Sequence, residues 1–334
     1  MDKTLGAAVI GTGFGKNHAK AYAENPLTRL IAVCDKRLDA ARQVAQEHAA
    51  PLATADYREA VADPRVDVVS VAGPDFLHAD MCVAALEAGK DVLCEKPLAL
   101  TMDDCRRIAD AAKRTGRALM VGQICRYAPG FALAHKLVMD GAIGDLFFVE
   151  SEYAHHYEKA RGVDDWRVDP RRHAVIGGGC HAVDLLRWVA GNPTEVTAYA
   201  NHKSLLDWPV DDCTVAILRF PNNVIGKVFC SIGCRRPYTM RSVFYGTRGT
   251  VVCDNRSPTI QVCRHGLDPL HSFVDLPVDI AHHNINHEVR EFIDAIHAGR
   301  KPEVDALEGA RTVAVAAAIV ESARTGKPET VRYL

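Results

Sequence analysis

The fold is decided by residues 8–18, which read AVIGTGFGKNH and lie near the start of the chain. An apolar run enters a glycine-rich turn, and a helix-forming stretch follows. Glycines in such a turn allow positive φ angles and let backbone N–H groups approach a pyrophosphate at the positive end of the helix. The third glycine, Gly15, comes one residue earlier than in a strict G-x-G-x-x-G fingerprint, which would place it at Lys16. The turn is therefore a variant of the fingerprint, and only the surrounding sequence can show whether it binds a dinucleotide.

The first third of the chain alternates apolar runs with helical patterns. The expected strands are Leu5–Ile10, Leu30–Cys34, Val66–Val71, Asp91–Cys94 and Ala118–Val121, and the expected helices are Leu38–His48, His78–Ala88 and Met102–Thr115. Almost wholly apolar runs are typical of parallel strands that are covered on both faces. The alternation predicts an α/β domain of the Rossmann type over residues 1–122, with a doubly wound parallel sheet.

Asp35 strengthens the interpretation of the turn as a dinucleotide site. It ends the second expected strand, 24 residues after Gly11 (35 minus 11), near the roughly 20 expected for an acid that binds ribose hydroxyls. The alternative is a tight turn beside a solvated acid. An acid here favours NAD, because it repels the additional phosphate of NADP. Lys36 and Arg37 follow directly and offer that phosphate a partner, so NADP remains an alternative.

Two further segments follow strand ends: PDFLH at residues 74–78 and EKP at residues 95–97. Ligands of open α/β sheets bind beyond the carboxyl ends of the strands. A lysine beside a nicotinamide, here Lys96, would donate to a substrate hydroxyl or act as a base, and the alternative is a surface lysine. Arg126 follows the last strand and borders the nicotinamide or belongs to a hinge. The predicted cofactor contacts are Gly11, Thr12, Gly13, Phe14, Gly15, Asp35, Lys36, Pro74, His78, Glu95, Lys96 and Arg126.

The rest of the chain, residues 123–334, changes character. Strands are expected at Leu146–Tyr153, Val196–Ala200, Thr214–Phe220, Val224–Ser231, Ser242–Tyr245, Thr250–Cys253 and Ile260–Val262, and helices at Phe131–Met139, His181–Val189, Glu288–Ala298 and Ala306–Arg324. Consecutive strands without helices between them indicate an α+β domain with a mostly antiparallel sheet. We expect this second domain to bind the substrate.

A second candidate site segment covers residues 177–188, GGGCHAVDLLRW. The three glycines let the backbone come close to a ligand, and His181 begins a helix. Histidine titrates near neutrality and suits the acceptance of a hydroxyl proton, with Asp184 on the same helix face to orient it. The alternative is a helix-start histidine that caps or packs, with Asp184 paired to Arg187. The residues alone favour neither interpretation.

The irregular stretch between these segments supplies candidate substrate contacts. Sugar sites combine polar groups with an aromatic face, and Tyr153, His155, Trp166 and Arg167 offer both. Equally, these residues could only stabilise a loop. No metal is expected, because the histidine pairs 155–156 and 282–283 lack the paired ligand spacing of a zinc site.

The quoted segments occur in the order found in the Gfo/Idh/MocA oxidoreductases, a family that includes glucose–fructose oxidoreductase and inositol dehydrogenase. The chain resembles this family over essentially its whole length. The resemblance implies a Rossmann domain joined to a C-terminal domain with a large open sheet, whose exposed face forms a homodimer or homotetramer. It also implies that Lys96 is the catalytic lysine and His181 the catalytic histidine. Many sugar dehydrogenases of the family carry an Asp four residues before that histidine, where this chain has Gly177, so the Asp–His pair is incomplete.

The resemblance implies an enzyme, an NAD(P)-dependent oxidoreductase. It would transfer hydride between the nicotinamide and a secondary alcohol of a sugar, sugar derivative or cyclitol. Two alternatives stay open. An NAD-dependent glycosidase would act through a transient keto-sugar, and a non-catalytic regulator would bind NAD or sugar without turnover.

Composition excludes several other classes of protein. The chain has 334 residues and a formal net charge of -2, which argues against a general electrostatic attraction to nucleic acid. No apolar run approaches the roughly 20 residues of a membrane span, and we expect no signal peptide. Eleven cysteines without repeating spacing are typical of reduced thiols. These features predict a cytoplasmic protein.

Overall fold

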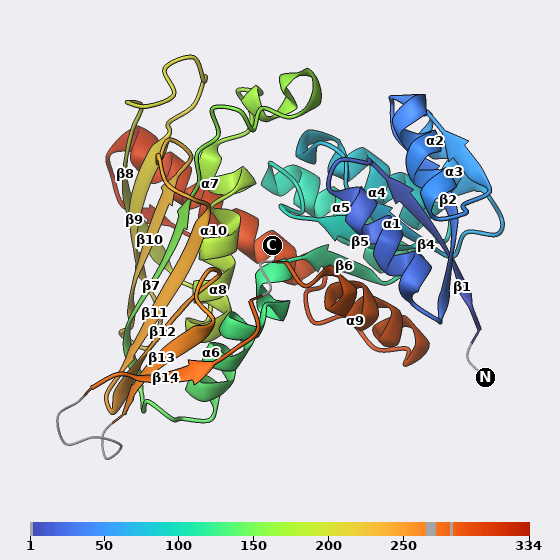
Figure 1. Ribbon diagram of the computed structural model, residues 1–334. Coiled ribbons are helices and arrows are strands. Elements are labelled where there is room, and N and C mark those ends of the chain that lie inside the picture. The colour runs from blue at the N-terminus through green and yellow to red at the C-terminus, as the bar shows by residue number, and fades with distance from the viewer. Residues whose placement is uncertain (1–2, 265–271, 281–282) are drawn as a thin grey trace. The chain divides into compact units, whose positions relative to one another are not determined.

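The computed structural model describes residues 3–264, 272–280 and 283–334. It separates into two compact units (Figure 1). The first unit holds residues 3–123, 285–310 and 334, and the second holds the described residues between 124 and 284 together with residues 311–333. Among the described helices, none is both long and apolar enough to cross a bilayer.

The first unit is built on a six-stranded parallel sheet with the order β3-β2-β1-β4-β5-β6. The strands are β1 (Leu5–Ile10), β2 (Thr28–Cys34), β3 (Leu52–Thr54), β4 (Val68–Val71), β5 (Asp91–Glu95) and β6 (Leu119–Gly122). Every residue of β1 and β4 is buried, as expected for central strands covered on both faces. The prediction of a doubly wound parallel sheet is confirmed.

Helices connect these strands and cover the sheet. They are α1 (Gly15–Glu24), α2 (Leu38–Glu47), α3 (Tyr57–Ala62), α4 (His78–Glu87) and α5 (Met102–Thr115), with a short 3-10 helix, η1 (Asp75–Leu77), before α4. The order of the strands and their right-handed crossovers place α1 and α2 on one face and α4 and α5 on the other. The sequence patterns did not predict β3 or α3, which are only 3 and 6 residues long.

The boundaries of the first unit differ from those expected from sequence. Helix α9 (Ile285–His297) and the segment after it belong to the first unit, although residues 123–334 were expected to form the second domain. The apolar side of α9, which includes Val289 and Phe292, is buried, and the helix packs on α1 and β5. The main-chain N–H of Val121 on β6 also donates to the carbonyl oxygen of Val304 (2.8 Å). These contacts explain the return of the chain to the first unit.

The second unit contains a nine-stranded sheet with the order β14-β13-β12-β11-β7-β10-β9-β8-β15. The strands are β7 (Leu146–Ala154), β8 (Glu195–Asn201), β9 (Cys213–Arg219), β10 (Ile225–Ser231), β11 (Thr239–Gly246), β12 (Gly249–Asp254), β13 (Thr259–Arg264), β14 (Val274–Pro277) and β15 (Glu329–Thr330). All neighbours are antiparallel except β7 and β10, which are parallel. The predicted mostly antiparallel sheet is confirmed.

One face of this sheet is covered by helices. They are α6 (Pro129–Met139), α7 (Ala174–Gly177), α8 (Cys180–Ala190) and part of α10 (Ala306–Thr325). The unit also contains the 3-10 segments η2 (Ile124–Tyr127) and η3 (Val163–Val168). Helix α8 packs on β7, β10 and β11, and α6 packs on β12 and β13. The inward-facing side chains of β7 therefore meet the start of α8.

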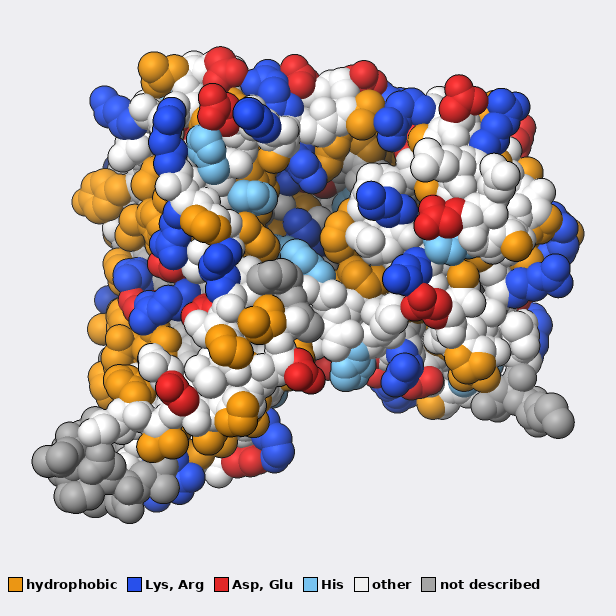
Figure 2. Space-filling view, viewed as in Figure 1, with side chains coloured by type: hydrophobic (Ala, Val, Ile, Leu, Met, Phe, Trp, Pro, Cys, Tyr) orange, Lys and Arg blue, Asp and Glu red, His pale blue; other side chains and the backbone are white. Residues whose placement is uncertain are grey.

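The opposite face of the sheet exposes apolar side chains. Tyr199 on β8 is 77% exposed and lies opposite Val215 on β9, and Ile217 two residues further on is 46% exposed. Ile225 on β10 is 49% exposed. Figure 2 shows hydrophobic side chains, in orange, along this side of the second unit at the left of the view. So much exposed apolar area on one face is typical of an interaction surface.

Candidate active site

The glycine-rich turn of the first unit requires glycine at two positions. Gly11 has φ +92°, and a Cβ atom there would lie 2.6 Å from the carbonyl oxygen of Ala72. A Cβ on Gly15 would lie 2.9 Å from a methyl carbon of Val9, so Gly15 lets α1 pack closely on β1. Gly13 differs, because no atom of the described residues lies within 4 Å of a Cβ built there. The backbone at Gly13 is thus open to an approaching group.

These residues fit the pyrophosphate of a dinucleotide. Helix α1 begins at Gly15, and its N-cap residue, Phe14, provides no side-chain hydrogen bond to the first N–H groups. Uncapped N–H groups at a helix N-terminus, together with the helix dipole, attract a phosphate. The open backbone at Gly13 lies directly before this helix. A dinucleotide would be held here by Thr12, Gly13 and Phe14.

Asp35 lies just after β2 and is joined to the turn. Its Oδ2 accepts hydrogen bonds from the main-chain N–H (2.8 Å) and the hydroxyl (2.6 Å) of Thr12, and its Oδ1 accepts one from the N–H of Arg37 (3.0 Å). Burial acts to raise the pKa of Asp35, but these hydrogen bonds outweigh it and lower that pKa below its ordinary value. The carboxylate is therefore ionised at neutral pH. Lys36 beside it is exposed.

Lys96 follows the carboxyl end of β5, as predicted, and its main chain is held firmly. The N–H of Lys96 donates to Oε2 of Glu95 (3.2 Å), and the Lys96–Pro97 peptide is cis. His78 lies with its two ring nitrogens 2.8 Å from the carbonyl oxygen of Pro97 and 3.1 Å from that of Gly73. His78 is 1% exposed, so it ties the turn after β5 to the segment that contains Pro74.

His181 lies in the second unit, in the first turn of α8, and is 2% exposed. Its Nδ1 lies 3.5 Å from Sγ of Cys125. The imidazole ring lies 6.3 Å from the ring of Tyr153 and 6.5 Å from that of His283. Cys125 was not predicted from sequence, because a contact between η2 and α8 depends on tertiary packing.

Gly177 lies against a guanidinium group that was likewise not predicted. A Cβ on Gly177 would lie 2.3 Å from Cζ of Arg172, and Arg172 is 4% exposed. Its guanidinium also lies 5.0 Å from the Trp166 ring. A cation therefore covers the position at which the resemblance places an aspartate. The departure from the family pattern leaves a guanidinium beside Gly177 rather than an empty space.

Asp184 is buried and hydrogen-bonded to side chains of the second unit, as expected for a residue with a structural role. Its carboxylate accepts two hydrogen bonds from the guanidinium of Arg126, at 2.8 and 2.7 Å, and one from the hydroxyl of Thr312 at 3.0 Å. Arg187 lies 3.7 Å away. Asp184 and Arg126 are 1% and 5% exposed. Asp184 thus joins α8 to η2, and Arg126, which was predicted to contact the cofactor, forms a buried ion pair within the second unit.

Of the predicted substrate contacts, Tyr153 lies beside His181, and His155 lies beside Tyr153. The hydroxyl of Tyr153 lies 2.7 Å from that of Tyr157 and 3.4 Å from Nδ1 of His155. Tyr238, which carried no sequence signal, lies 5.5 Å from Tyr153 and 4.8 Å from His155, ring to ring. Burial raises the pKa of Tyr153 and Tyr238 well above the usual range, so both phenols keep their protons.

The other two predicted contacts lie in η3. The guanidinium of Arg167 lies 4.9 Å from the ring of Trp166 and 6.0 Å from that of Tyr157. It also donates to the carbonyl oxygen of Ala160 (3.0 Å). Tyr157 thus links η3 to the aromatic cluster around His155.

The described residues include a group with the composition of a metal site, although the sequence predicted no metal. The ligand atoms of His18, Glu95 and Glu288 all lie within 4.8 Å of one another, and the three residues are buried. None belongs to the histidine pairs weighed from sequence, and His282 lies outside the described residues. One imidazole and two carboxylates can hold either a divalent cation or a shared proton.

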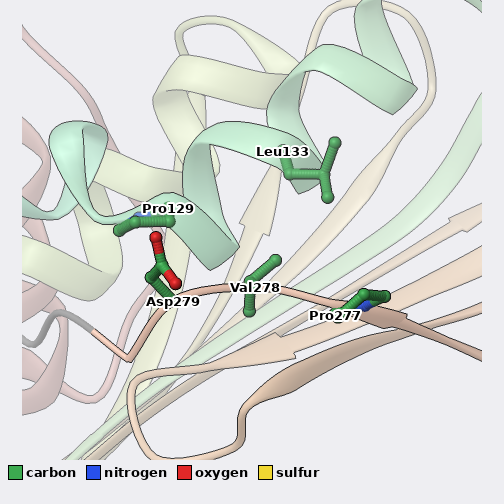
Figure 3. A pocket seen from close by; sticks show the side chains of 5 residues that line it. All are labelled: Pro129, Leu133, Pro277, Val278 and Asp279. Carbon is green, nitrogen blue, oxygen red and sulfur yellow. The ribbon is translucent and has the colours of Figure 1, made fainter.

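A shallow groove of about 410 Å³ lies elsewhere in the second unit. Figure 3 shows its lining, formed by the start of α6, the end of β14 and the residues after it: Pro129, Leu133, Pro277, Val278 and Asp279. None of these residues was predicted to bind substrate or cofactor. The groove is therefore not part of the predicted site.

Comparison with known proteins agrees with the fold and with NAD as the cofactor. Residues 5–123 match the family model described as "Oxidoreductase family, NAD-binding Rossmann fold". Residues 131–252 match the GFO/IDH/MocA C-terminal domain. Together these matches cover most of the chain.

Similar proteins act on sugars and cyclitols. The inositol 2-dehydrogenase of Rhizobium meliloti is 29% identical over 334 residues, covering 96% of this chain and 97% of that protein. The levoglucosan dehydrogenase of Pseudarthrobacter phenanthrenivorans is 29% identical over 302 residues, covering 75% and 73%. A solved levoglucosan dehydrogenase in complex with NADH and L-sorbose has a TM-score of 0.92 at 26% identity and covers 100% of both chains. The chain belongs to the Gfo/Idh/MocA family of NAD-binding oxidoreductases.

Proposed function

We propose that this enzyme oxidises or reduces one secondary alcohol of a sugar, sugar derivative or cyclitol with NAD. The observation that carries the proposal is the buried imidazole of His181 beside a cluster of tyrosine and histidine side chains, in a chain whose other unit has an NAD-binding fold. Relatives named as inositol, levoglucosan and apiose dehydrogenases support this substrate class.

The proposed roles follow from the chemistry of the side chains. The nicotinamide supplies the site that accepts or gives the hydride. His181 takes the hydroxyl proton at Nε2, because its Nδ1 lies against Cys125. Lys96 donates a hydrogen bond to the same hydroxyl oxygen and so stabilises the charge that develops on it. This division of work requires no aspartate at Gly177.

The cofactor is bound mainly by the first unit in this proposal. The backbone from Gly11 to Gly15 holds the pyrophosphate, and Asp35 binds the adenosine ribose. Because Asp35 is ionised, it repels the phosphate that distinguishes NADP, and NAD is preferred. Lys36 and Pro74 stay predicted cofactor contacts. His78, Glu95 and Arg126 were predicted contacts as well, and we propose that they act indirectly, by holding the neighbouring segments in place.

Substrate recognition is assigned to the second unit. Tyr153 presents a hydroxyl group beside His181, and His155 presents an imidazole beside Tyr153. Trp166 and Arg167 offer an aromatic face and a cation. Phenol hydroxyls and imidazole nitrogens hydrogen-bond to the several hydroxyls of a polyol.

An absorbance screen at the nicotinamide band tests the function. NAD and NADP are each offered with a panel of inositols, sugars, anhydrosugars and glycosides. We expect a change of absorbance with NAD and at least one polyol. Release of free sugar from a glycoside without net absorbance change would instead indicate the glycosidase. Binding of NADH without turnover on any member of the panel would indicate a regulator.

A second copy of the chain is the partner proposed for the exposed face of the sheet in the second unit. Tyr199, Val215 and Ile217 give it a continuous apolar area, and an open sheet face of this kind is covered in an oligomer. Light scattering should give the mass of a dimer or tetramer. Replacing Tyr199 and Ile217 together by Glu should yield the monomer, and an unchanged mass would refute this assignment.

The proposed location is the cytoplasm. All eleven cysteines are free thiols, as expected in a reducing compartment. The net charge of -2 offers no general attraction to nucleic acid. Cell fractionation with an antibody to the protein tests the location.

A further inference from the structure

Three ionisable side chains meet inside the first unit, apart from any exposed surface. His18 comes from α1, Glu95 from the end of β5 and Glu288 from α9. His18 and Glu288 are 0% exposed and Glu95 is 8% exposed. Buried acids of this kind require an explanation, because an isolated charge in an apolar interior is costly.

Two of the three groups are fully engaged. Nε2 of His18 lies 2.9 Å from Oε1 of Glu95, and Nδ1 of His18 lies 3.1 Å from the hydroxyl oxygen of Ser70. That hydroxyl is in turn 2.9 Å from the hydroxyl of Tyr22. Oε2 of Glu95 accepts the N–H of Lys96. The Glu95 carboxylate therefore joins α1 to the main chain of the lysine that the proposed function places in catalysis.

Glu288 is different. Both of its carboxylate oxygens are shielded from solvent, and neither has a hydrogen-bond partner among the residues that the structure describes. Its ligand atom lies within 4.8 Å of those of Glu95 and His18. A Cβ on Gly122 would lie 3.2 Å from Oε1 of Glu288. Glycine at this position of β6 therefore makes room for the Glu288 carboxyl group. Glu288 is thus held beside Glu95, the acid with which it can share a proton.

The neighbouring charges determine the protonation state of Glu288. If Glu288 and Glu95 were both ionised, two negative charges would lie side by side in the interior, next to the His18 imidazole. Two carboxylates at such a site share a proton. His18 is hydrogen-bonded to Glu95, which keeps the negative charge on Glu95. Tyr22, which also faces the group, is neutral, and the main-chain N–H of Lys96 is bonded to Glu95, so neither balances a charge on Glu288.

We propose that Glu288 is a neutral carboxylic acid at physiological pH and donates its proton in a hydrogen bond to Glu95. It acts as a positioning residue, because the bond fixes the carboxylate that receives the N–H of Lys96. Burial and the neighbouring Glu95 both raise the pKa of Glu288, in agreement with this geometry. The protonation of Glu288 stands by itself, whereas its importance for turnover rests on the proposed function of Lys96.

A divalent cation is the competing occupant. A neutral imidazole and two carboxylates would balance its charge, and Ser70 would orient the imidazole from behind. The distances favour the proton, however, because His18 and Glu95 are already in direct hydrogen-bond contact at 2.9 Å. A cation with bonds of roughly 2.0–2.2 Å would also need further ligands to complete its coordination.

Infrared spectroscopy of the purified holoenzyme at pH 8 tests the protonation. The carbonyl stretch of a neutral carboxylic acid should be present in the wild type and missing in Glu288→Gln. The matched control is Glu291→Gln on the same helix, at an acid paired with Arg300, and it should keep the band. A wild-type spectrum without the band would overturn the proposal. So would one equivalent of a divalent metal in wild-type protein that is lost in Glu288→Gln.

Kinetics test the positioning role separately. Glutamine can donate an N–H to Glu95 as the neutral acid does, but leucine cannot. We expect Glu288→Leu to lower kcat by about tenfold with the Kd of NADH unchanged, and Glu288→Gln to restore most of the loss. Equal kcat values in both variants would overturn the positioning role. The infrared result does not depend on activity, so failure of the proposed dehydrogenase function would leave it intact.

Discussion

Asp184→Asn removes the negative charge from the buried ion pair that joins α8 to η2. The side chains of Asp184 and Arg126 are only 1% and 3% exposed, and the carboxylate accepts two short hydrogen bonds from the guanidinium. The substitution keeps the shape of the side chain but removes the carboxylate that balances the buried charge of Arg126. Breaking a buried pair from one side costs about 3–5 kcal/mol. We therefore expect the free energy of unfolding of the second unit to fall by about that amount.

Urea unfolding followed by tryptophan fluorescence measures this loss. The three tryptophans are Trp166, Trp188 and Trp208, and all lie in the second unit, so the signal reports on the unit that contains the pair. The control is Asp140→Asn, which removes an exposed pair with Lys136 on α6 and should cost less than about 0.5 kcal/mol.

A double variant separates charge from shape. In Arg126→Met combined with Asp184→Leu, no charge of this pair is left unmatched, while Arg187 keeps its hydrogen bonds to Thr312 and Asn192. It should lose less stability than Asp184→Asn alone. A loss below about 1 kcal/mol for Asp184→Asn would refute the reasoning, because the carboxylate would then not be needed to balance Arg126.

Three further predictions concern catalysis, cofactor choice and pH. His181→Ala should lower kcat by about 10²–10⁴-fold with NADH still bound by fluorescence titration, and an unchanged kcat would remove His181 from proton transfer. Asp35→Ser should weaken NAD binding and improve kcat/KM with NADP, whereas an unaltered preference would show that Asp35 does not read the ribose. Glu288 has a folded-state pKa raised above its unfolded value, so its stabilisation is complete below about pH 4 and is lost as pH rises toward the raised pKa. The Tm of Glu288→Gln relative to the wild type should therefore increase from pH 5 to pH 8, and a constant difference would contradict the neutral acid.

Local patterns predicted the elements that have strong signals of their own. The strand Leu5–Ile10 was predicted with its observed bounds, because a continuous apolar run ends at a glycine. The helix Met102–Thr115 was also correct, with Thr101 as its N-cap and Gly116 after its last residue. The three-residue strand β3 was missed, because a run so short carries no periodicity. The return of α9 to the first unit depends on packing against α1, which no local pattern records.

In the candidate site, too, local patterns predict some residues, whereas others become neighbours only through the fold. Glycine-rich turns, strand ends and helix starts identify Gly11, Lys96 and His181 as candidates from sequence. The contact of Cys125 with His181 and the guanidinium of Arg172 over Gly177 arise from segments that meet only in the folded second unit. Such partners have no required spacing in the chain, so spacing rules cannot find them.

The central proposal is that Lys96 and His181 both act on the hydroxyl group whose carbon exchanges hydride with NAD. A crystal structure of the enzyme with NADH and a polyol found in the absorbance screen measures this directly. We predict that Nζ of Lys96 and Nε2 of His181 both lie within about 3.2 Å of the same substrate oxygen. An ordered complex in which either group points away from the oxygen at the carbon that exchanges hydride would contradict the account.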